Sequence, residues 1–370
     1  MPLSRYGPRS RHGTGGNPAE VCPVRPRGRR FRWIVALALG AAAAVWPSLA
    51  LANPPRPNWN PGPPPAPLFP RTSEMHQISD LFWVMLILSG IIFIGVCAAI
   101  VISMVRFSGK PGDPEPRQVF GNRRVELLWT AIPSVILVVA FVFTVRAIRD
   151  INSAHGSSFN IYAIGHQWWW EFQYPSLKIV TANELHVPTG QQIHFHVESW
   201  DVIHSFWAPQ LQRQIDANPK QDNAVYAEYN IPGVYGGACY EYCGPAHAWM
   251  KFEVVVQTPA QFAAWVKHEQ KPAATPHGAT AAGLKVFLNN TCVNCHAILG
   301  TGAGGAVGPN LTHFSSRWTI GAGAAPMTRQ ALVQWIRDPS SFKPGALMPP
   351  YKFLSNKDVN ALADYLMSLK

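Results

Sequence analysis

The amino-acid sequence predicts a multidomain membrane protein with a two-helix transmembrane hairpin, an all-β sandwich and a small, mostly α-helical C-terminal domain. Two apolar runs, at 78–105 and 127–145, are long enough to cross a bilayer, whose hydrocarbon needs about 20 helical residues. After Ile151 the pattern changes to short alternating stretches between Pro and Gly turns, which is typical of strands. Helical spacing returns at 331–337 and 357–370.

Composition narrows the class of function. The chain has 370 residues, of which 48% are hydrophobic and only 14% charged, as expected for membrane spans plus several folded domains. The net charge of +11 would suit a nucleic-acid binder, but the residues before Asn53 contribute +7 of it, from eight Arg and one Glu. The remainder has no basic stripe interleaved with aromatic residues, which argues against nucleic-acid binding.

The N-terminal region has the pattern of an export signal followed by a spacer. A basic stretch at 29–32, an apolar run at 33–49 and small residues at 50–52 predict a signal peptide over 1–52. An uncleaved membrane anchor is the alternative. Residues 53–74 are rich in proline and predict an extended spacer.

The remaining domain boundaries follow from changes in pattern. The hairpin is predicted over 75–150, the β domain over 151–265, a linker over 266–278 and the C-terminal domain over 279–370. Lys and Arg outnumber Asp and Glu between the two apolar runs, so the positive-inside rule places that loop in the cytoplasm and both folded domains outside it.

Four metal-binding side chains lie within one short segment, namely Cys239, Cys243, His247 and Met250. Soft sulfur with imidazole suits copper or zinc, and a methionine favours electron-transfer copper over structural zinc. Two nearby thiolates can bridge two copper ions. A second imidazole is required, and His204 follows a predicted strand. A disulfide between the two cysteines is the alternative.

This set of residues resembles the dinuclear copper (CuA) site of cytochrome c oxidase subunit II, a family with a helical hairpin and a cupredoxin-like β domain. The resemblance covers 75–258. It implies that Cys239 and Cys243 bridge the coppers, that His204 and Met250 complete one ion, and that His247 and the Glu241 carbonyl complete the other. It further implies that the Glu241 carboxylate binds magnesium at the interface with subunit I.

Two other residues take roles from the same resemblance. Trp168, within the aromatic segment 165–170, matches a residue between the docked cytochrome and the copper, whereas Trp169 and Trp170 are equally compatible with a sandwich core. Glu126 matches a residue at a proton-uptake entrance, but a carboxylate at a helix start also interacts favourably with the helix dipole. The segment 209–218 departs from the family pattern, which leaves the type of partner subunit open.

A second redox site is predicted by Cys292-Val293-Asn294-Cys295-His296. In this C-x-x-C-H pattern both thiols attach haem covalently and the histidine binds iron. Zinc or a redox dithiol is the alternative. A methionine would supply the second axial ligand. Met348, before two prolines, is favoured over Met327, and Met367 fits a helix core. The segment 280–370 resembles class I cytochrome c domains.

The two outer domains carry opposite charge. The segment 155–270 has five Lys and Arg against ten Asp and Glu, a net charge of −5, and 279–370 has eight against three, a net charge of +5. Opposite fields and a short tether favour docking. We therefore expect the C-terminal domain to dock on the β domain near Trp168. The alternative is that both charges belong to solvated surfaces.

Together these features imply an electron-entry subunit of cytochrome c oxidase in the bacterial inner membrane, with its copper and haem domains on the periplasmic side. The resemblance implies subunits I and III as partners and an external donor such as cytochrome c. Oxygen reduction belongs to subunit I. The alternative is a haem c and CuA subunit of another reductase, such as a nitric-oxide reductase, or a copper-delivery protein. A quinol oxidase subunit would have no use for the copper ligands.

Overall fold

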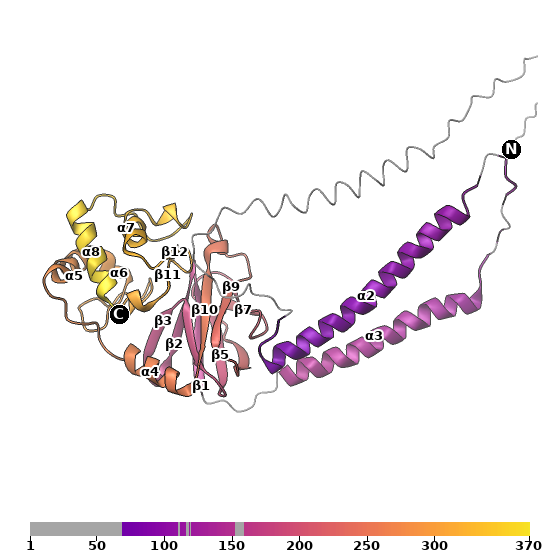
Figure 1. The fold of residues 1–370 in the computed structure, drawn as a ribbon, viewed down its shortest axis with the longest axis horizontal. Helices are drawn as coiled ribbons and strands as arrows, with labels where there is room; N and C mark the ends of the chain where they lie inside the picture. Colours follow the sequence, from indigo (N-terminus) through magenta and orange to yellow (C-terminus); the bar gives the residue numbers. More distant parts are fainter. Residues whose placement is uncertain (1–68, 110–111, 116–117, 119, 152–158) are drawn as a thin grey trace, which may run out of the picture. The chain divides into compact units, whose positions relative to one another are not determined.

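The computed structural model describes residues 69–109, 112–115, 118, 120–151 and 159–370 (Figure 1). The signal peptide predicted over 1–52 and most of the spacer predicted over 53–74 lie outside these residues.

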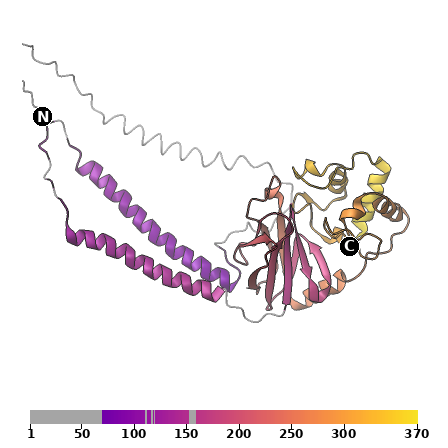
Figure 2. The same cartoon turned by 180° about the vertical axis from the view of Figure 1, so that it is seen from behind.

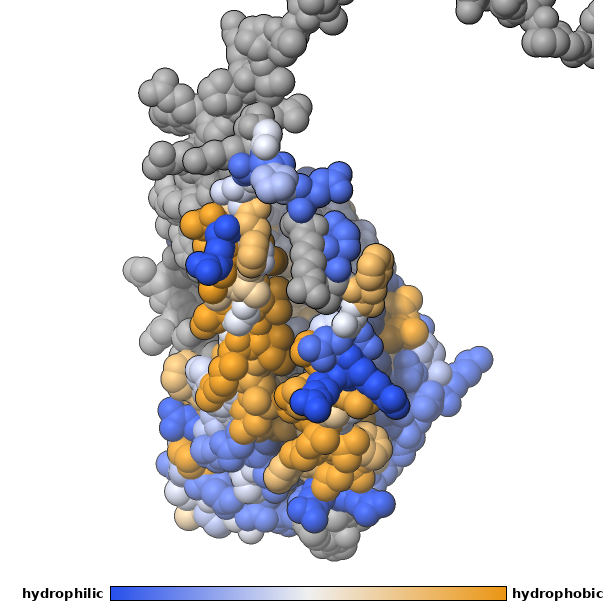
Figure 3. Space-filling view, turned by 90° about the vertical axis from the view of Figure 1, so that its right-hand side faces the viewer, coloured by the Kyte–Doolittle hydropathy of each residue, from blue (hydrophilic) through white to orange (hydrophobic). Residues whose placement is uncertain are grey.

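Two long apolar helices form the predicted hairpin. They are α2 (Ser73–Arg106) and α3 (Arg123–Ile151), and by length and composition both can cross a membrane. The Thr72 hydroxyl accepts the Met75 N–H and caps α2, which therefore begins two residues before the predicted start at 75. Hydrophobic side chains cover much of the surface of these helices (Figure 3). In water such a surface would be costly, so a bilayer is its natural environment.

The β domain, residues 159–258, contains one ten-stranded sheet (Figures 1 and 2). Its strands are β1 (Phe159–His166), β2 (Trp169–Tyr174), β3 (Ile179–Ala182), β4 (Glu184–Pro188), β5 (Gln192–Ser199), β6 (His204–Trp207), β7 (Ile215–Pro219), β8 (Asn223–Glu228), β9 (Gly233–Cys239) and β10 (Lys251–Gln257). The order is β3-β2-β1-β5-β7-β6-β9-β10-β4, and β8 pairs with β5. The first and last strands of this order are separated in sequence by Asn183 alone, so the sheet is nearly closed.

Large aromatic side chains fill the interior of this sheet. Trp170, Phe172, Phe195, Phe206 and Phe252 are fully buried, because alternate residues of each strand point to the same face. Their rings meet mostly edge to face, and the Phe206 and Phe252 rings stack at 4.7 Å. Each buried side chain of this kind contributes about 1.5–3 kcal/mol of burial. The predicted cupredoxin-like fold is confirmed, and this core supports the loops at one end of the sheet.

Helix α4 (Pro259–Glu269) follows the last strand. Thr258 and Gln261 form a capping box at its start, and Phe262 and Trp265 pack against the core of the β domain. The linker predicted over 266–278 therefore begins later, because the helix continues to Glu269. The alternating pattern of the strands gave no signal for this helix.

The C-terminal domain, residues 279–370, is small and mostly helical, as predicted. Its helices are α5 (Ala279–Asn289), α6 (Cys292–Cys295), α7 (Arg329–Arg337) and α8 (Asn356–Ser368), with a two-stranded ribbon of β11 (Thr319–Ile320) and β12 (Ala325–Pro326). Four short 3₁₀ turns, at Pro175–Leu177, His247–Trp249, Phe314–Ser316 and Pro339–Ser341, complete the described elements. Thr328 and Ser355 cap α7 and α8.

Helices α5 and α8 pack closely because α5 has a glycine at the contact. A Cβ at Gly283 would lie 2.0 Å from the Ala361 carbonyl oxygen and 2.5 Å from the Tyr365 Cβ. We expect Gly283→Ala to destabilise the C-terminal domain by about 1–3 kcal/mol through overpacking. Gly302→Ala is the matched control, since a Cβ there meets nothing within 4 Å. Denaturant unfolding measures both, and equal midpoints would contradict this account of the contact.

Candidate metal and haem sites

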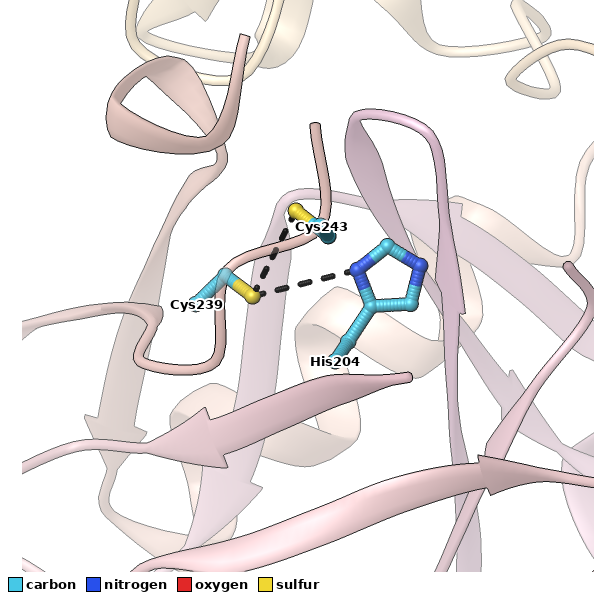
Figure 4. Close-up of side chains that lie close together, drawn as sticks. All are labelled: His204, Cys239 and Cys243. Carbon is cyan, nitrogen blue, oxygen red and sulfur yellow. Dashed lines mark hydrogen bonds between the residues drawn. The ribbon is translucent and has the colours of Figure 1, made fainter. Parts of the chain in front are cut away.

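One candidate site lies at the end of the β domain where β6 begins and β9 ends. Pairing of β6 with β9 brings His204 beside Cys239, and the turn after β9 returns Cys243 to the same place. The Cys239 Sγ lies 3.8 Å from the Cys243 Sγ and 3.8 Å from the His204 Nδ1 (Figure 4). A disulfide requires about 2.05 Å, so the predicted disulfide alternative is not formed.

The other three predicted donors meet the same two sulfur atoms. The His247 Nδ1 lies 3.5 Å and the Met250 Sδ 3.9 Å from the Cys243 Sγ, and the Glu241 carbonyl oxygen lies 3.2 Å from the Cys239 Sγ. The Glu241 residue itself is exposed. Two thiols, two imidazoles, a thioether and a carbonyl so close together fit a pair of soft metal ions.

The two thiols differ in how readily they ionise. The adjacent Cys243 thiol and, to a lesser degree, the His204 ring lower the pKa of Cys239, against the opposing effect of burial. The hydrogen bond to Cys239 and burial raise the pKa of Cys243. Since thiolates are the metal ligands, one thiol ionises readily and a bound cation would displace the proton of the other.

Asp201 holds the ring of His204. Its Oδ1 lies 2.8 Å from the His204 Nε2, which leaves the Nδ1 facing the sulfur atoms. Burial raises the pKa of Asp201, but hydrogen bonds from His204 and from the Gln167 and Val202 N–H groups have the larger, opposite effect. The pKa therefore lies below its usual value and the carboxylate is ionised. Such outer carboxylates fix the orientation of a ligand ring and increase its basicity.

We expect Asp201→Ala to weaken copper binding by roughly 10- to 100-fold, because the His204 ring loses its support. Asp222→Ala is the control. It breaks a similar pair, Asp222 with His196 at 2.7 Å, on the exposed face of the same domain. Copper titration in competition with a chelator measures the difference. Equal affinities of the two variants would show that Asp201 does not support the metal ligand.

Three consecutive tryptophans near this site lie in different environments. The Trp168 Nε1–H donates to the Cys243 carbonyl at 3.0 Å, and the Gln167 side chain donates to the same oxygen at 2.7 Å. Trp170 belongs to the core, as one of the two sequence alternatives held. Trp169 instead stacks on His166 at 4.3 Å and packs against Ala182 and Ala322, so it lies at the contact with the C-terminal domain.

A second candidate site is a cavity of about 240 Å³. Cys292, Cys295, His296 and Met348 all line it, whereas Met327 and Met367 do not. The short helix α6 begins at the first cysteine and ends at the second, so both thiols face one ligand. The His296 Nδ1–H donates to the Pro309 carbonyl at 2.8 Å, which leaves the Nε2 to bind iron. These residues fit a covalently attached haem.

Several lining residues were not predicted from the sequence. Arg317 lines the cavity, donates to the Asn310 carbonyl and has its pKa lowered by burial. A guanidinium at this position suits the carboxylates that a haem carries. Gln167, Trp168, Trp169 and Asn183 of the β domain also line the cavity. The β domain thus forms one wall of it. A contact near Trp168 was expected from the opposite charges of the two domains, but the sequence gave no signal for Asn183, which belongs to a distant segment.

The remaining predicted positions have local contacts. The Glu126 carboxylate accepts the Asn122 N–H at 3.2 Å and so caps the start of α3, which agrees with the alternative of a local helix-terminus role. In the divergent segment 209–218, the Gln210 and Leu211 carbonyls accept bonds from the Arg71 N–H and the Thr72 hydroxyl. This segment therefore contacts the start of α2.

A further group, His268, Glu269 and His313, has donor atoms close together. Both ring nitrogens of His313 face backbone carbonyls, that of Lys370 at 2.8 Å and that of Lys271 at 3.1 Å. These contacts occupy the nitrogen atoms that a metal would need.

The fold and the sites define a membrane-anchored cupredoxin-like domain joined to a C-terminal c-type cytochrome domain. Family models match in the same order: the transmembrane domain of cytochrome c oxidase subunit II at 70–146, its periplasmic domain at 176–258 and cytochrome c at 280–370. The chain belongs to the cytochrome c oxidase subunit 2 family. It is thus one subunit of a membrane-bound oxidoreductase and associates with other oxidase subunits.

Two relatives agree with this assignment. The chain is 37% identical over 311 residues to cytochrome c oxidase subunit 2 of Alkalihalophilus pseudofirmus. The match covers 82% of this chain and 90% of the relative. It is 35% identical over 276 residues to the same subunit of Bacillus sp. strain PS3, covering 69% and 77%. The periplasmic domain of subunit II of the Bradyrhizobium japonicum cytochrome oxidase is 30% identical, with a TM-score of 0.31, over 32% of this chain and 97% of that structure.

Proposed function

We propose that this chain is the electron-entry subunit of a cytochrome c oxidase. Electrons from an external donor such as cytochrome c pass through haem c and then a CuA pair to subunit I, which reduces oxygen to water. The observation that carries this proposal is the position of Trp168. Its side chain lines the cavity of the C-x-x-C-H segment, and its indole N–H binds the carbonyl of Cys243.

The chain's own residues have distinct roles in this proposal. Cys239, Cys243, His204, His247, Met250 and the Glu241 carbonyl hold the copper ions, and Cys292, Cys295, His296 and Met348 hold the haem. When bound, these groups supply reversible one-electron chemistry. The burial of His204 and Met250 excludes water from the copper side. The carbonyl of Pro309 and the carboxylate of Asp201 orient the two ligand rings. Trp168 provides a connection from the cavity wall to a copper ligand.

The membrane arrangement follows from the same proposal. The basic residues between α2 and α3 remain in the cytoplasm, and both redox domains face the periplasm. Subunit I, with subunit III beside it, contacts the copper end of the β domain, where the exposed Glu241 carboxylate binds magnesium. Glu126, at the start of α3, lies on the cytoplasmic side, where protons are taken up.

Purification of the full chain from its own membranes tests this function. We expect a haem–copper subunit I to copurify, two copper ions and one haem c per chain of this subunit, and oxygen consumption driven by a reduced c-type cytochrome. The double variant Cys292→Ala with Cys295→Ala should lose haem c and donor oxidation, but it should retain the copper. A preparation that reduces nitric oxide and not oxygen, or that holds no copper pair, would overturn the proposal.

A further inference from the structure

A buried lysine joins the two redox domains. The side chain of Lys343, in the C-terminal domain, is only 4% exposed. Its Nζ donates to the carbonyls of Trp168 and Trp249 in the β domain and to that of Gly321 in its own domain. Trp249 directly precedes the predicted copper ligand Met250, and Trp168 binds Cys243. One ammonium group thus contacts segments next to both candidate sites.

The environment of this ammonium is unusual because, among the described residues, no carboxylate is paired with it. An ammonium has three donor hydrogens, and the three carbonyls provide one acceptor for each. Burial lowers the pKa of Lys343 to about 7, which reflects the loss of hydration that these carbonyls must offset. A hydrogen-bond set of this kind depends strongly on distance and direction. It therefore fixes an orientation, which a screened surface charge would not do.

Other hydrogen bonds also join the two domains at this interface. The Trp318 N–H donates to the Glu184 carboxylate at 2.7 Å, and the Lys251 N–H donates to the Ala322 carbonyl at 3.2 Å. Within the part of the chain that the structure describes, each recorded ion pair joins two residues of the same domain. Opposite charges also interact at this interface, since Glu184 and Glu269 raise the pKa of the buried Arg317 against the effect of burial. The directional hydrogen bonds define the orientation of the contact.

We propose that Lys343 is a positioning residue that fixes the C-terminal domain on Trp168 and thereby sets the rate of electron passage between the two sites. The predicted effect on the rate of electron passage rests on the proposed function. The predicted effect on the docking of the two domains does not depend on it. The opposite charges bring the domains together, and Lys343 selects the orientation in which Trp168 closes the cavity.

The test compares Lys343→Met with Lys357→Met in the full chain assembled in the oxidase. Both changes remove one positive charge from the C-terminal domain, but Lys357 is exposed on α8. Laser-flash reduction of haem c gives the first-order rate of electron transfer to copper. Hydrogen exchange at the Lys251 and Trp318 N–H groups reports docking without any electron transfer.

We expect Lys343→Met to slow the haem-to-copper step by roughly 10- to 100-fold, because small displacements of a reacting pair have effects of this size. Exchange at both amides should accelerate on the order of tenfold or more. The haem and copper contents, both spectra and the bimolecular rate of haem reduction should remain unchanged. Lys357→Met should match the wild type in every measurement.

Other results would overturn the inference or the proposed function separately. Unchanged rate and unchanged exchange in Lys343→Met would overturn the role of Lys343. A wild-type oxidase without any haem-to-copper electron transfer would overturn the proposed function. In that case hydrogen exchange at the two amides would still show whether Lys343 fixes the docking of the domains. If Lys343→Met fails to retain haem, Lys343→Ala provides the same test with a smaller side chain that has no donor, and wild-type exchange in that variant would overturn the inference.

Discussion

Replacing Cys239 with serine is expected to remove the proposed dinuclear copper centre and to lower oxygen consumption by more than roughly 100-fold, a larger effect than the loss of an outer-shell partner usually has. The Cys239 Sγ contacts the Cys243 Sγ, the His204 Nδ1 and the Glu241 carbonyl, so it lies at the middle of the donor set. A hard hydroxyl oxygen is a poor bridge between soft copper ions. Copper analysis and the near-infrared charge-transfer band measure the loss.

Cys97→Ser is the control for this change. Cys97 is an exposed thiol within α2, away from both candidate sites. The control should retain two copper ions and full activity. Retention of the copper pair in the Cys239→Ser variant would contradict the assigned ligands, whereas loss in both variants would point to a general defect in assembly.

Replacing Met348 with leucine is expected to lower the reduction potential of haem c by on the order of 0.1 V or more, since axial ligands set haem potentials over a range of about 0.8 V. A thioether ligand favours ferrous iron, and leucine cannot replace it. Met348 lines the same cavity as His296. Spectroelectrochemical titration measures the potential, and loss of the methionine-to-iron charge-transfer band identifies the ligand.

Met327→Leu is the matched control, because Met327 packs in the same domain but does not line the cavity. Its potential should remain at the wild-type value. If the Met327 variant loses the charge-transfer band and the Met348 variant keeps it, the axial ligand is Met327, the alternative that the sequence left open.

Four of the candidate copper donors could be proposed from the sequence because they lie within one short segment and their chemistry is distinctive. The position of His204 was harder, since it is 35 residues from Cys239 in sequence and reaches it only through the pairing of β6 with β9. Resemblance to a known family supplied this partner. The haem segment was predictable for a simpler reason, because both thiols and the histidine are consecutive on and after one short helix.

The contact between the domains could be predicted only in outline. The charges indicated docking near Trp168, and the structure brings the C-terminal domain to that residue. The sequence gave no reason to single out Lys343, because a lysine in a loop normally lies in solvent. Its three acceptors are backbone carbonyls from three distant segments, and no side-chain pattern encodes such a site. Arg317 was not predicted either, because an arginine also normally lies in solvent.

The most direct test of the account is a single-turnover experiment on the purified oxidase, in which a reduced donor is mixed rapidly with the oxidised enzyme and both chromophores are followed. The account predicts that haem c is reduced first in a bimolecular step. The copper band should then bleach at a rate that is independent of the donor and enzyme concentrations. Bleaching of the copper band before haem reduction, or at a rate proportional to donor concentration, would contradict it.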